Sequence, residues 1–222
     1  MSRIVDLTMP MADHFRWPFQ RGKSGDFATG STFEIGWFRT SAHAFTHMDS
    51  QRHIMAEGFS LDEIPLDRTV GDAAVVDLSP IAPDTPVDAA LLAEKASHLR
   101  EGDIFVMKSG WDRVHSPFTP EFWTEAPHVT REGAEWLLAR KVATVAFDFP
   151  QDWVIRLLAQ GEPPKPLAEN VTHDVLLKNG VVLIEYLVNT IALRGPRTYF
   201  CALPLKLPES DGSPVRAIAW EN

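Results

Sequence analysis

Hydrophobic residues along the 222-residue chain gather in short runs that are separated by Gly, Pro and Asp. Runs of this length, rich in Val, Ile and Phe and bounded by turn residues, predict β-strands. We expect strands at residues 4–8, 32–39, 73–78, 104–108, 142–147, 181–185, 197–203 and 215–220. Several of these runs are continuously apolar rather than alternating, which indicates strands covered on both faces of a sheet.

Helical spacing of apolar positions is found in only three places, at residues 86–99, 130–140 and 172–178. Thr130 suits a helix N-cap, and Arg140 suits the negative end of the same helix dipole. Gly180, just after the third segment, is a typical left-handed helix stop. Many strands with few helices predict an α/β fold, with mixed sheets packed against a few helices in one domain over residues 1–222.

Composition excludes two classes of partner. The net charge is −9 and Lys and Arg are not clustered, so we expect no nucleic acid partner. No apolar stretch approaches the ~20 residues of a membrane helix. The single cysteine, Cys201, and an N-terminal segment without a secretion signal lead us to expect a cytoplasmic protein.

Candidate chemistry concentrates in one segment, where His43, His47, Asp49 and His53 follow an H-x3-H-x-D-x3-H spacing. Imidazole and carboxylate are the usual ligands of zinc, manganese and related ions. A helix would place His43 and His47 on one face, whereas an extended chain places all four on one face. We favour the extended form for the start of the segment; a polar surface loop without a metal is the alternative.

The segment resembles the H-x-G-T-H-x-D-x-P-x-H signature of the cyclase family, the metal-dependent hydrolases that include bacterial kynurenine formamidase and isatin hydrolase. The matching positions are His43, Thr46, His47, Asp49 and His53. Phe45 replaces the signature glycine, so either the unusual backbone angle is not needed or an aromatic ring narrows the pocket. Gln51 replaces the signature proline and adds a donor and an acceptor near the metal.

Other pieces fit the same family in order. Residues 4–8 resemble its opening strand and residues 106–111 its central strand. His173 and Glu185, twelve residues apart, resemble its second ligand pair. The residues agree with this, because His173 falls in the first turn of a predicted helix and a carboxylate ending an apolar strand is costly to bury unless it is paired or metal-bound.

The resemblance implies a swivelling β/β/α fold, assembled as a homodimer or higher homo-oligomer. It implies a first metal on His43, His47 and Asp49, and a second on Asp49, His173 and Glu185. The metal would be zinc or manganese, as one or two ions. The expected catalytic residues are His53, as general base, and Glu185.

We therefore expect hydrolysis of a C–N or C–O bond in a small amide, lactam, ester or lactone by metal-activated water, with His53 moving the proton. Two alternatives remain open: a metal-dependent cyclase or dehydratase, and a metal- or small-molecule-binding protein without turnover. Residues 148–152 differ from the D-T-P-S-x-D pattern associated with kynurenine formamidases. This argues against assuming N-formylkynurenine as the substrate.

Overall fold

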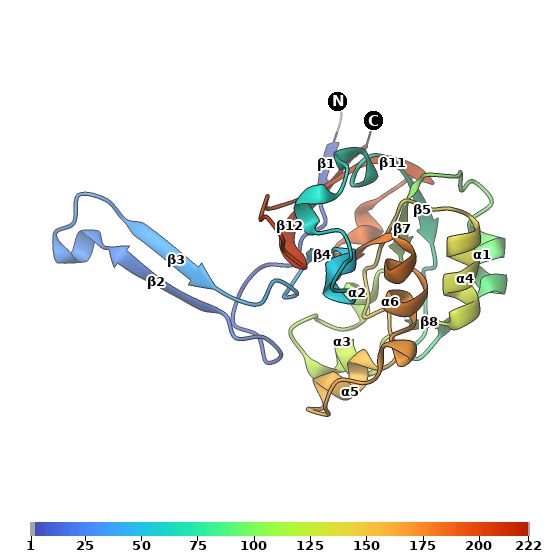
Figure 1. Ribbon diagram of the computed structural model, residues 1–222, viewed down its shortest axis with the longest axis horizontal. Helices are drawn as coiled ribbons and strands as arrows, with labels where there is room; N and C mark the ends of the chain where they lie inside the picture. The colour runs from blue at the N-terminus through green and yellow to red at the C-terminus, as the bar shows by residue number, and fades with distance from the viewer. Residues whose placement is uncertain (1–2, 222) are drawn as a thin grey trace.

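An eight-stranded sheet forms the centre of the computed structural model, which describes residues 3–221 (Figure 1). Its order is β1-β12-β11-β5-β7-β9-β10-β4, and β4 also pairs with β12, so the sheet closes on itself like a barrel. Strands β5, β7, β9 and β10 run parallel, and the other pairs are antiparallel. The strands are β1 (Arg3–Asp6), β4 (His47–Asp49), β5 (Val70–Asp77), β7 (Ile104–Lys108), β9 (Thr144–Ala146), β10 (Val182–Glu185), β11 (Arg197–Pro204) and β12 (Gly212–Glu221).

The central strands are buried on both faces. Successive residues of a strand point to opposite sides of its sheet. Val75 and Val106 lie in the apolar cluster inside the barrel, whereas Val76 and Phe105 lie in the cluster beneath the helices. Each face of the sheet packs against its own apolar core, which explains the continuous apolar runs. The prediction that these strands are covered on both faces is confirmed.

Helices cover the outer face of the sheet. The helices α1 (Ala89–Lys95), α4 (Arg131–Ala139) and α6 (Val171–Val175) match the three predicted segments but are shorter (Figure 1). Thr130 caps α4 as expected, because its side chain accepts a hydrogen bond from the Gly133 amide. The remaining short elements were not predicted: α2 (Trp111–Val114), α3 (Pro120–Thr124), α5 (Ile155–Ala159) and the two-residue strands β6 (Pro86–Val87) and β8 (His128–Val129). The expected mixed α/β fold is confirmed.

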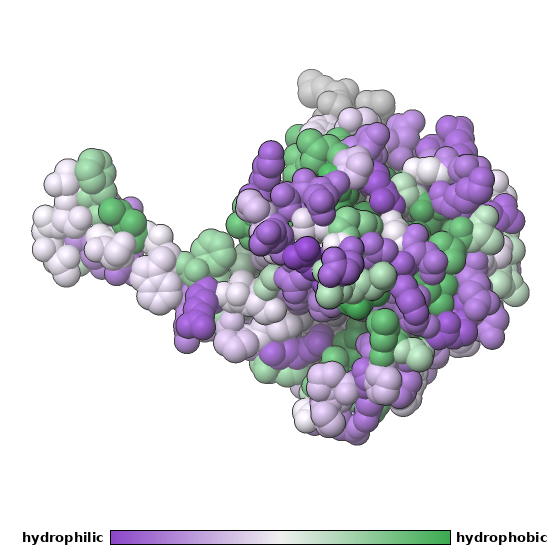
Figure 2. Space-filling view, viewed as in Figure 1, coloured by the Kyte–Doolittle hydropathy of each residue, from purple (hydrophilic) through white to green (hydrophobic). Residues whose placement is uncertain are grey.

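A β-hairpin, which we call the arm, projects away from this body (Figures 1 and 2). It consists of β2 (Gln20–Gly25) and β3 (Ile35–Arg39), joined by residues 26–34, which include a 3-10 helix at Phe27–Thr29. The strand predicted at residues 32–39 therefore exists, but every residue of β3 is exposed. Its partner β2 was missed, because its sequence shows no apolar alternation. Trp37 lies across Gly22, where an added Cβ would come within 2.6 Å of the ring.

Within residues 3–221, no helix has the length and apolar character needed to cross a membrane. The cytoplasmic location and the assignment of one domain to residues 1–222 stay predictions.

Candidate metal centre

Three of the predicted ligands lie on adjacent strands. His47 and Asp49 lie on β4, and Glu185, at the end of β10, is the direct cross-strand partner of His47. Only His47–Asp49 is extended. The extended form expected at the start of the segment was wrong, because His43 lies in a turn and Phe45 has a left-handed backbone. His53 lies in a 3-10 helix (Gln51–His53), so the shared-face argument was wrong for both His43 and His53. The turn nevertheless returns His53 to the site, with its ring centroid 3.9 Å from that of His43.

The hydrogen bonds of His47 and His173 leave one nitrogen of each ring facing the centre. His47 Nδ1 donates to the Phe45 carbonyl at 2.9 Å, and His173 Nδ1 donates to Asp152 Oδ2 at 2.7 Å. Because a carbonyl oxygen only accepts, Nδ1 of His47 carries a proton, and Nε2 is the nitrogen that could bind a metal. This arrangement, with the outer nitrogen bound to a carbonyl or a carboxylate, is typical of metal-ligating histidines.

The distances between the inward-facing atoms fit a divalent cation. Metal bonds of about 2.0–2.2 Å at a tetrahedral angle place neighbouring ligand atoms about 3.3–3.6 Å apart. His47 Nε2 lies 3.2 Å from Asp49 Oδ1 and 3.6 Å from Glu185 Oε2. His173 Nε2 lies 3.5 Å from both Asp49 Oδ2 and Glu185 Oε1. Asp49 thus presents a different oxygen to each imidazole.

One carboxylate oxygen of Asp49 is buried without a hydrogen-bond donor in the described part of the chain. Its side chain is 1% exposed, and its Oδ2 accepts no hydrogen bond from any residue between 3 and 221. A buried carboxylate oxygen without a donor is costly, since water no longer solvates it. A cation beside Oδ2 would remove this cost, so the donor set fits a metal.

His43 completes the cluster from the loop before β4. Its Nδ1 lies 2.7 Å from Asp49 Oδ1, and its Nε2 lies 2.9 Å from Asp211 Oδ2. Gly212 makes this position possible, because a Cβ there would come within 2.6 Å of the His43 ring. His43, His53 and Asp211 are also close enough to hold a cation together. Asp211 was not predicted from the sequence, because it comes from a turn before β12 and carries no local signal.

The charges in the centre perturb several pKa values. Burial favours the neutral form of Asp49, but the neighbouring histidines outweigh it and hold the pKa of this carboxyl well below its usual range. Burial and the charge of Asp49 raise the pKa of Glu185. Burial opposes the charge of His43, yet Asp49 and Asp211 raise its pKa to about 9. A metal on His43 therefore has to displace a proton.

His53 stands at the edge of the centre. Its side chain is 31% exposed, and its Nδ1 lies 3.9 Å from Asp211 Oδ2. Burial lowers the pKa of His53 to about 4, and the neighbouring His43 and His173 act in the same direction. The imidazole is therefore neutral at pH 7, so one of its ring nitrogens is unprotonated.

Residues 148–152 hold two of the proposed ligands, Glu185 and His173, in position through hydrogen bonds. Gln151 donates to Glu185, and Asp152 accepts from the Thr172 amide and hydroxyl as well as from His173. Neither Gln151 nor Asp152 was predicted as a site residue, although this segment was seen to depart from the kynurenine formamidase pattern. The signal available was three polar residues, Asp148, Gln151 and Asp152, within five positions after a buried strand.

The two departures from the family signature have structural explanations. Phe45 has φ 61°, so the left-handed backbone typical of glycine is kept, and the idea that this angle is not needed was wrong. Its ring is fully buried, with centroids 5.2 Å from Trp17 and 5.8 Å from Phe19. Gln51 donates to the Lys178 carbonyl at 2.8 Å, so its amide fixes the turn before His53.

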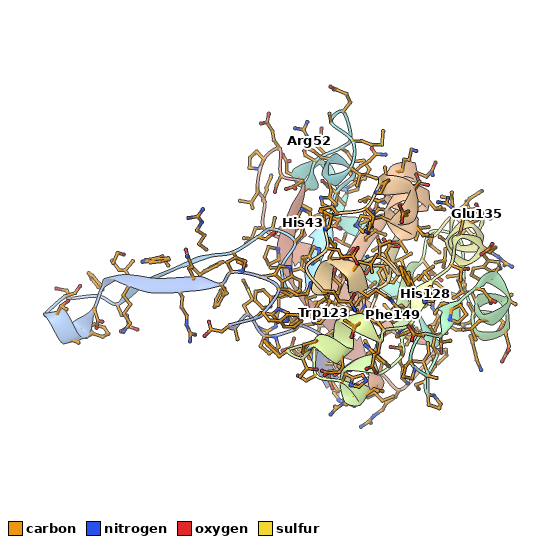
Figure 3. All side chains as sticks on the ribbon, turned by 90° about the horizontal axis from the view of Figure 1, so that it is seen from below. His43, Arg52, Trp123, His128, Glu135 and Phe149 are labelled. Carbon is orange, nitrogen blue, oxygen red and sulfur yellow. The ribbon has the colours of Figure 1, made fainter. Side chains whose placement is uncertain are left out.

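An aromatic wall stands beside the metal centre. Trp17, Phe45, Trp123 and Tyr186 contact one another, with ring centroids 4.9–5.7 Å apart. Tyr186 also lies 5.3 Å from His47. This wall and the ligand cluster occupy the side of the body from which the arm leaves, as His43 and Trp123 show in Figure 3.

Comparison with known proteins shows the family of the chain. Residues 5–151 match the family described as Putative cyclase. The chain belongs to the cyclase family. It is 30% identical to a kynurenine formamidase of Salinibacter ruber over 194 residues, covering 85% of this chain and 80% of the relative. It is 27% identical to an isatin hydrolase of Roseibium aggregatum, covering 86% and 76%.

The fold is shared with solved structures of the cyclase family. Isatin hydrolase A from Labrenzia aggregata, bound to benzyl benzoate, superposes with a TM-score of 0.79 at 21% identity, covering 99% of this chain and 93% of that one. The resemblance seen in the sequence is therefore confirmed. The chain is an enzyme of the metal-dependent hydrolase type, which supports hydrolysis over cyclisation and over binding without turnover.

Proposed function

We propose that this hydrolase cleaves the C–N bond of a small aromatic amide or lactam at a centre of one or two zinc or manganese ions. The proposed ligands are His43, His47, Asp49, His173 and Glu185. The observation that carries this proposal is the position of Asp49 between two imidazoles, each facing a different carboxylate oxygen at 3.2 or 3.5 Å. Such a carboxylate is suited to bridging two ions.

A divalent cation held by these residues would lower the pKa of a bound water to about 7 and polarise a carbonyl oxygen. The other groups of the chain handle the proton. His53 accepts it and passes it to the leaving nitrogen, while Asp211 stabilises the imidazolium that forms. Gln151 and Asp152 keep Glu185 and His173 in place. Glu185 is the second candidate for proton transfer, since burial and Asp49 raise its pKa.

The aromatic wall argues for a flat aromatic substrate. Trp17 is the partly exposed ring of this wall, so a flat molecule can stack against it, while the buried Phe45 and Trp123 support Trp17 from inside. The names of the two relatives point to N-formylkynurenine and isatin as candidates. The altered segment 148–152, with Gln151 donating to Glu185, favours a substrate other than N-formylkynurenine.

The proposal is tested with purified protein whose metal content is measured before and after loading with zinc or manganese. Hydrolysis of isatin, N-formylkynurenine and an aryl lactone is followed by absorbance. We expect turnover of at least one amide or lactam, lost on chelation and restored by metal. Fully loaded protein that hydrolyses none of them would contradict the proposal.

His53→Ala tests the proton transfer. We expect kcat to fall by about 10²–10⁴-fold, as is typical for loss of a general acid–base group, with unchanged metal content. His115→Ala is the matched control, because His115 pairs with Glu125 outside the site. Full activity in the His53 variant would remove this residue from the mechanism.

We also propose that the chain works as a homo-oligomer. Large apolar side chains of the arm, among them Phe33 and Trp37, are about half exposed or more, and a second copy of the chain would cover them.

A further inference from the structure

Arg16 carries a positive charge beside the aromatic wall. Its guanidinium carbon lies 5.0 Å from the ring centroid of Trp17 and 4.1 Å from that of Trp123. Its Nη1 is buried and has no hydrogen-bond partner within residues 3–221. The ion pairs that arginines form in this part of the chain all involve other arginines. A buried donor without an acceptor is costly, because water no longer solvates it.

The other arginines that lie on tryptophan rings have partners or solvent. Arg156 lies over such a ring and pairs with Asp84. Arg140 lies 4.7 Å from the ring centroid of Trp136, and its side chain is exposed to water at the end of α4. Arg16 is only partly exposed and is not paired. Stacking on tryptophan therefore explains where Arg16 lies but leaves one of its donors without an acceptor.

The chain around Arg16 is held in a fixed conformation. The Arg16 amide donates to His14 Nδ1 at 3.1 Å, and His14 Nε2 donates to the Pro117 carbonyl at 2.9 Å. His14 is neutral in this arrangement, in agreement with burial, which lowers its pKa. A guanidinium on such a segment is already oriented for a ligand, so little entropy is lost on binding.

Arg16 also reaches a hollow on the surface of the body. The hollow has a volume of about 340 Å³, within the range of small-molecule sites, and its lining is Phe15, Arg16, Leu158, Ala159 and Gly161. Arg16 supplies the only charge in this lining. An anionic group that enters the hollow therefore meets a guanidinium and no carboxylate.

Two ring contacts separate Arg16 from the metal centre. Trp123, under the guanidinium, lies 4.9 Å from Tyr186, and Tyr186 lies 5.3 Å from the proposed ligand His47. These are distances between ring centroids. A ring-containing substrate whose amide reaches the cation therefore points its opposite end toward Arg16.

We propose that Arg16 determines specificity by binding a carboxylate at the end of the substrate remote from the scissile amide. The planar guanidinium presents parallel N–H donors that match the two oxygens of a carboxylate. Nη1 then gains the acceptor that the described chain does not supply. This inference rests on the proposed hydrolysis of an aromatic amide and narrows the substrate class to amides that carry an acidic group. Isatin, which has no carboxylate, gains nothing from Arg16.

Binding to metal-free protein tests Arg16 separately from the chemistry. 4-Aminobenzoate and the neutral 4-aminobenzamide are titrated by calorimetry, with chelator present so that neither coordinates a cation. We expect the wild type to prefer the acid by about 10- to 100-fold and Arg16→Gln to lose this preference. Arg16→Lys keeps the charge without the planar fork and should retain part of it. Arg140→Gln, which also removes a guanidinium from a tryptophan ring, is the matched control and keeps the wild-type preference.

Turnover by the metal-loaded protein tests where the acidic group lies. The substrates are 4-formamidobenzoate, its isomer 2-formamidobenzoate and the neutral 4-formamidobenzamide. Arg16→Gln is expected to raise KM for 4-formamidobenzoate about 10- to 100-fold more than for the other two, with a smaller effect on kcat. Circular dichroism verifies that each variant is folded. An equal loss on all three substrates would mean that Arg16 only supports the aromatic wall and would overturn the proposal.

The two assays separate this inference from the proposed function. Equal affinity of the wild type for acid and amide, absence of binding, or a preference that survives in Arg16→Gln would each refute the carboxylate site whatever the turnover. If the loaded protein hydrolyses no amide while the metal-free protein still prefers the acid through Arg16, the hydrolysis is refuted and the carboxylate site stands.

Discussion

Phe45 offers a sharp test of how the site is built, since a large residue occupies a backbone position suited to glycine. Its φ of 61° lies in the left-handed region, and its ring is fully buried in the aromatic wall. The two variants Phe45→Ala and Phe45→Gly both remove the ring. They differ only in whether a Cβ remains on a left-handed residue.

The magnitudes predict an unusual order of stability. Loss of the buried ring lowers the free energy of unfolding by about 3–5 kcal/mol in both variants. The Ala variant keeps the left-handed cost of about 1–2 kcal/mol, which the Gly variant escapes. Glycine loses about 0.5–1 kcal/mol more backbone entropy on folding. The Gly variant is therefore expected to be the more stable of the two by about 0.5–1 kcal/mol.

Urea denaturation measures this difference, with chelator present in all samples so that bound metal does not contribute. A difference of 1 kcal/mol corresponds to about 2–4 °C in Tm for a chain of this size. Leu92, fully buried in the middle of α1, is the control position. There the usual order holds, with Ala more stable than Gly by about 1 kcal/mol. If Ala equals or exceeds Gly at position 45, the left-handed conformation is not what the fold requires.

Two further predictions concern groups outside the ligand set. Asp152→Asn removes the carboxylate that accepts the hydrogen bond of His173 Nδ1. Zinc affinity, measured by chelator competition, should then fall by about 10- to 100-fold. Unchanged affinity would show that Asp152 does not orient this ligand. Burial raises the pKa of Asp148 from 3.8 to about 6, which places the folded-state value above the unfolded one. Stability is then lost as the pH rises through this window, so the wild type should lose about 3 kcal/mol between pH 3.5 and 7 relative to Asp148→Asn in paired urea titrations. A constant difference between these two proteins across the titration would contradict the buried neutral carboxyl.

The sequence pattern predicted those site residues whose positions depend on a single strand or helix. His47 and Asp49 share a face because β4 is extended, and alternation along a strand follows from backbone geometry alone. His173 lies in α6 and Glu185 ends β10, both as expected from helix and strand patterns. His53 was correctly expected at the site for the wrong geometric reason, since a 3-10 turn and not a strand returns it there.

Other parts depend on contacts between distant segments. Asp211 reaches His43 only because β12 pairs with β4, a closure between residues more than 160 positions apart. The arm was half predicted, because β3 has strand-forming residues and β2 has none. The presence of a tryptophan at position 37 gives no hint that it lies on Gly22 instead of in a core. Contacts of this kind cannot be predicted until it is known which distant segment each residue packs against.

The pairing of β4 with both β10 and β12 has a consequence for how substrate preference can vary. His47 is in register with Glu185 on one side and with Pro214 on the other, so hydrogen-bonded ladders on both flanks fix the positions of His47 and Asp49. His43 and His173 lie outside the sheet, in a turn and in α6, so changes in the connecting segments act on these two residues first. We therefore expect substrate preference to vary through the segments around β4 while His47 and Asp49 keep their places.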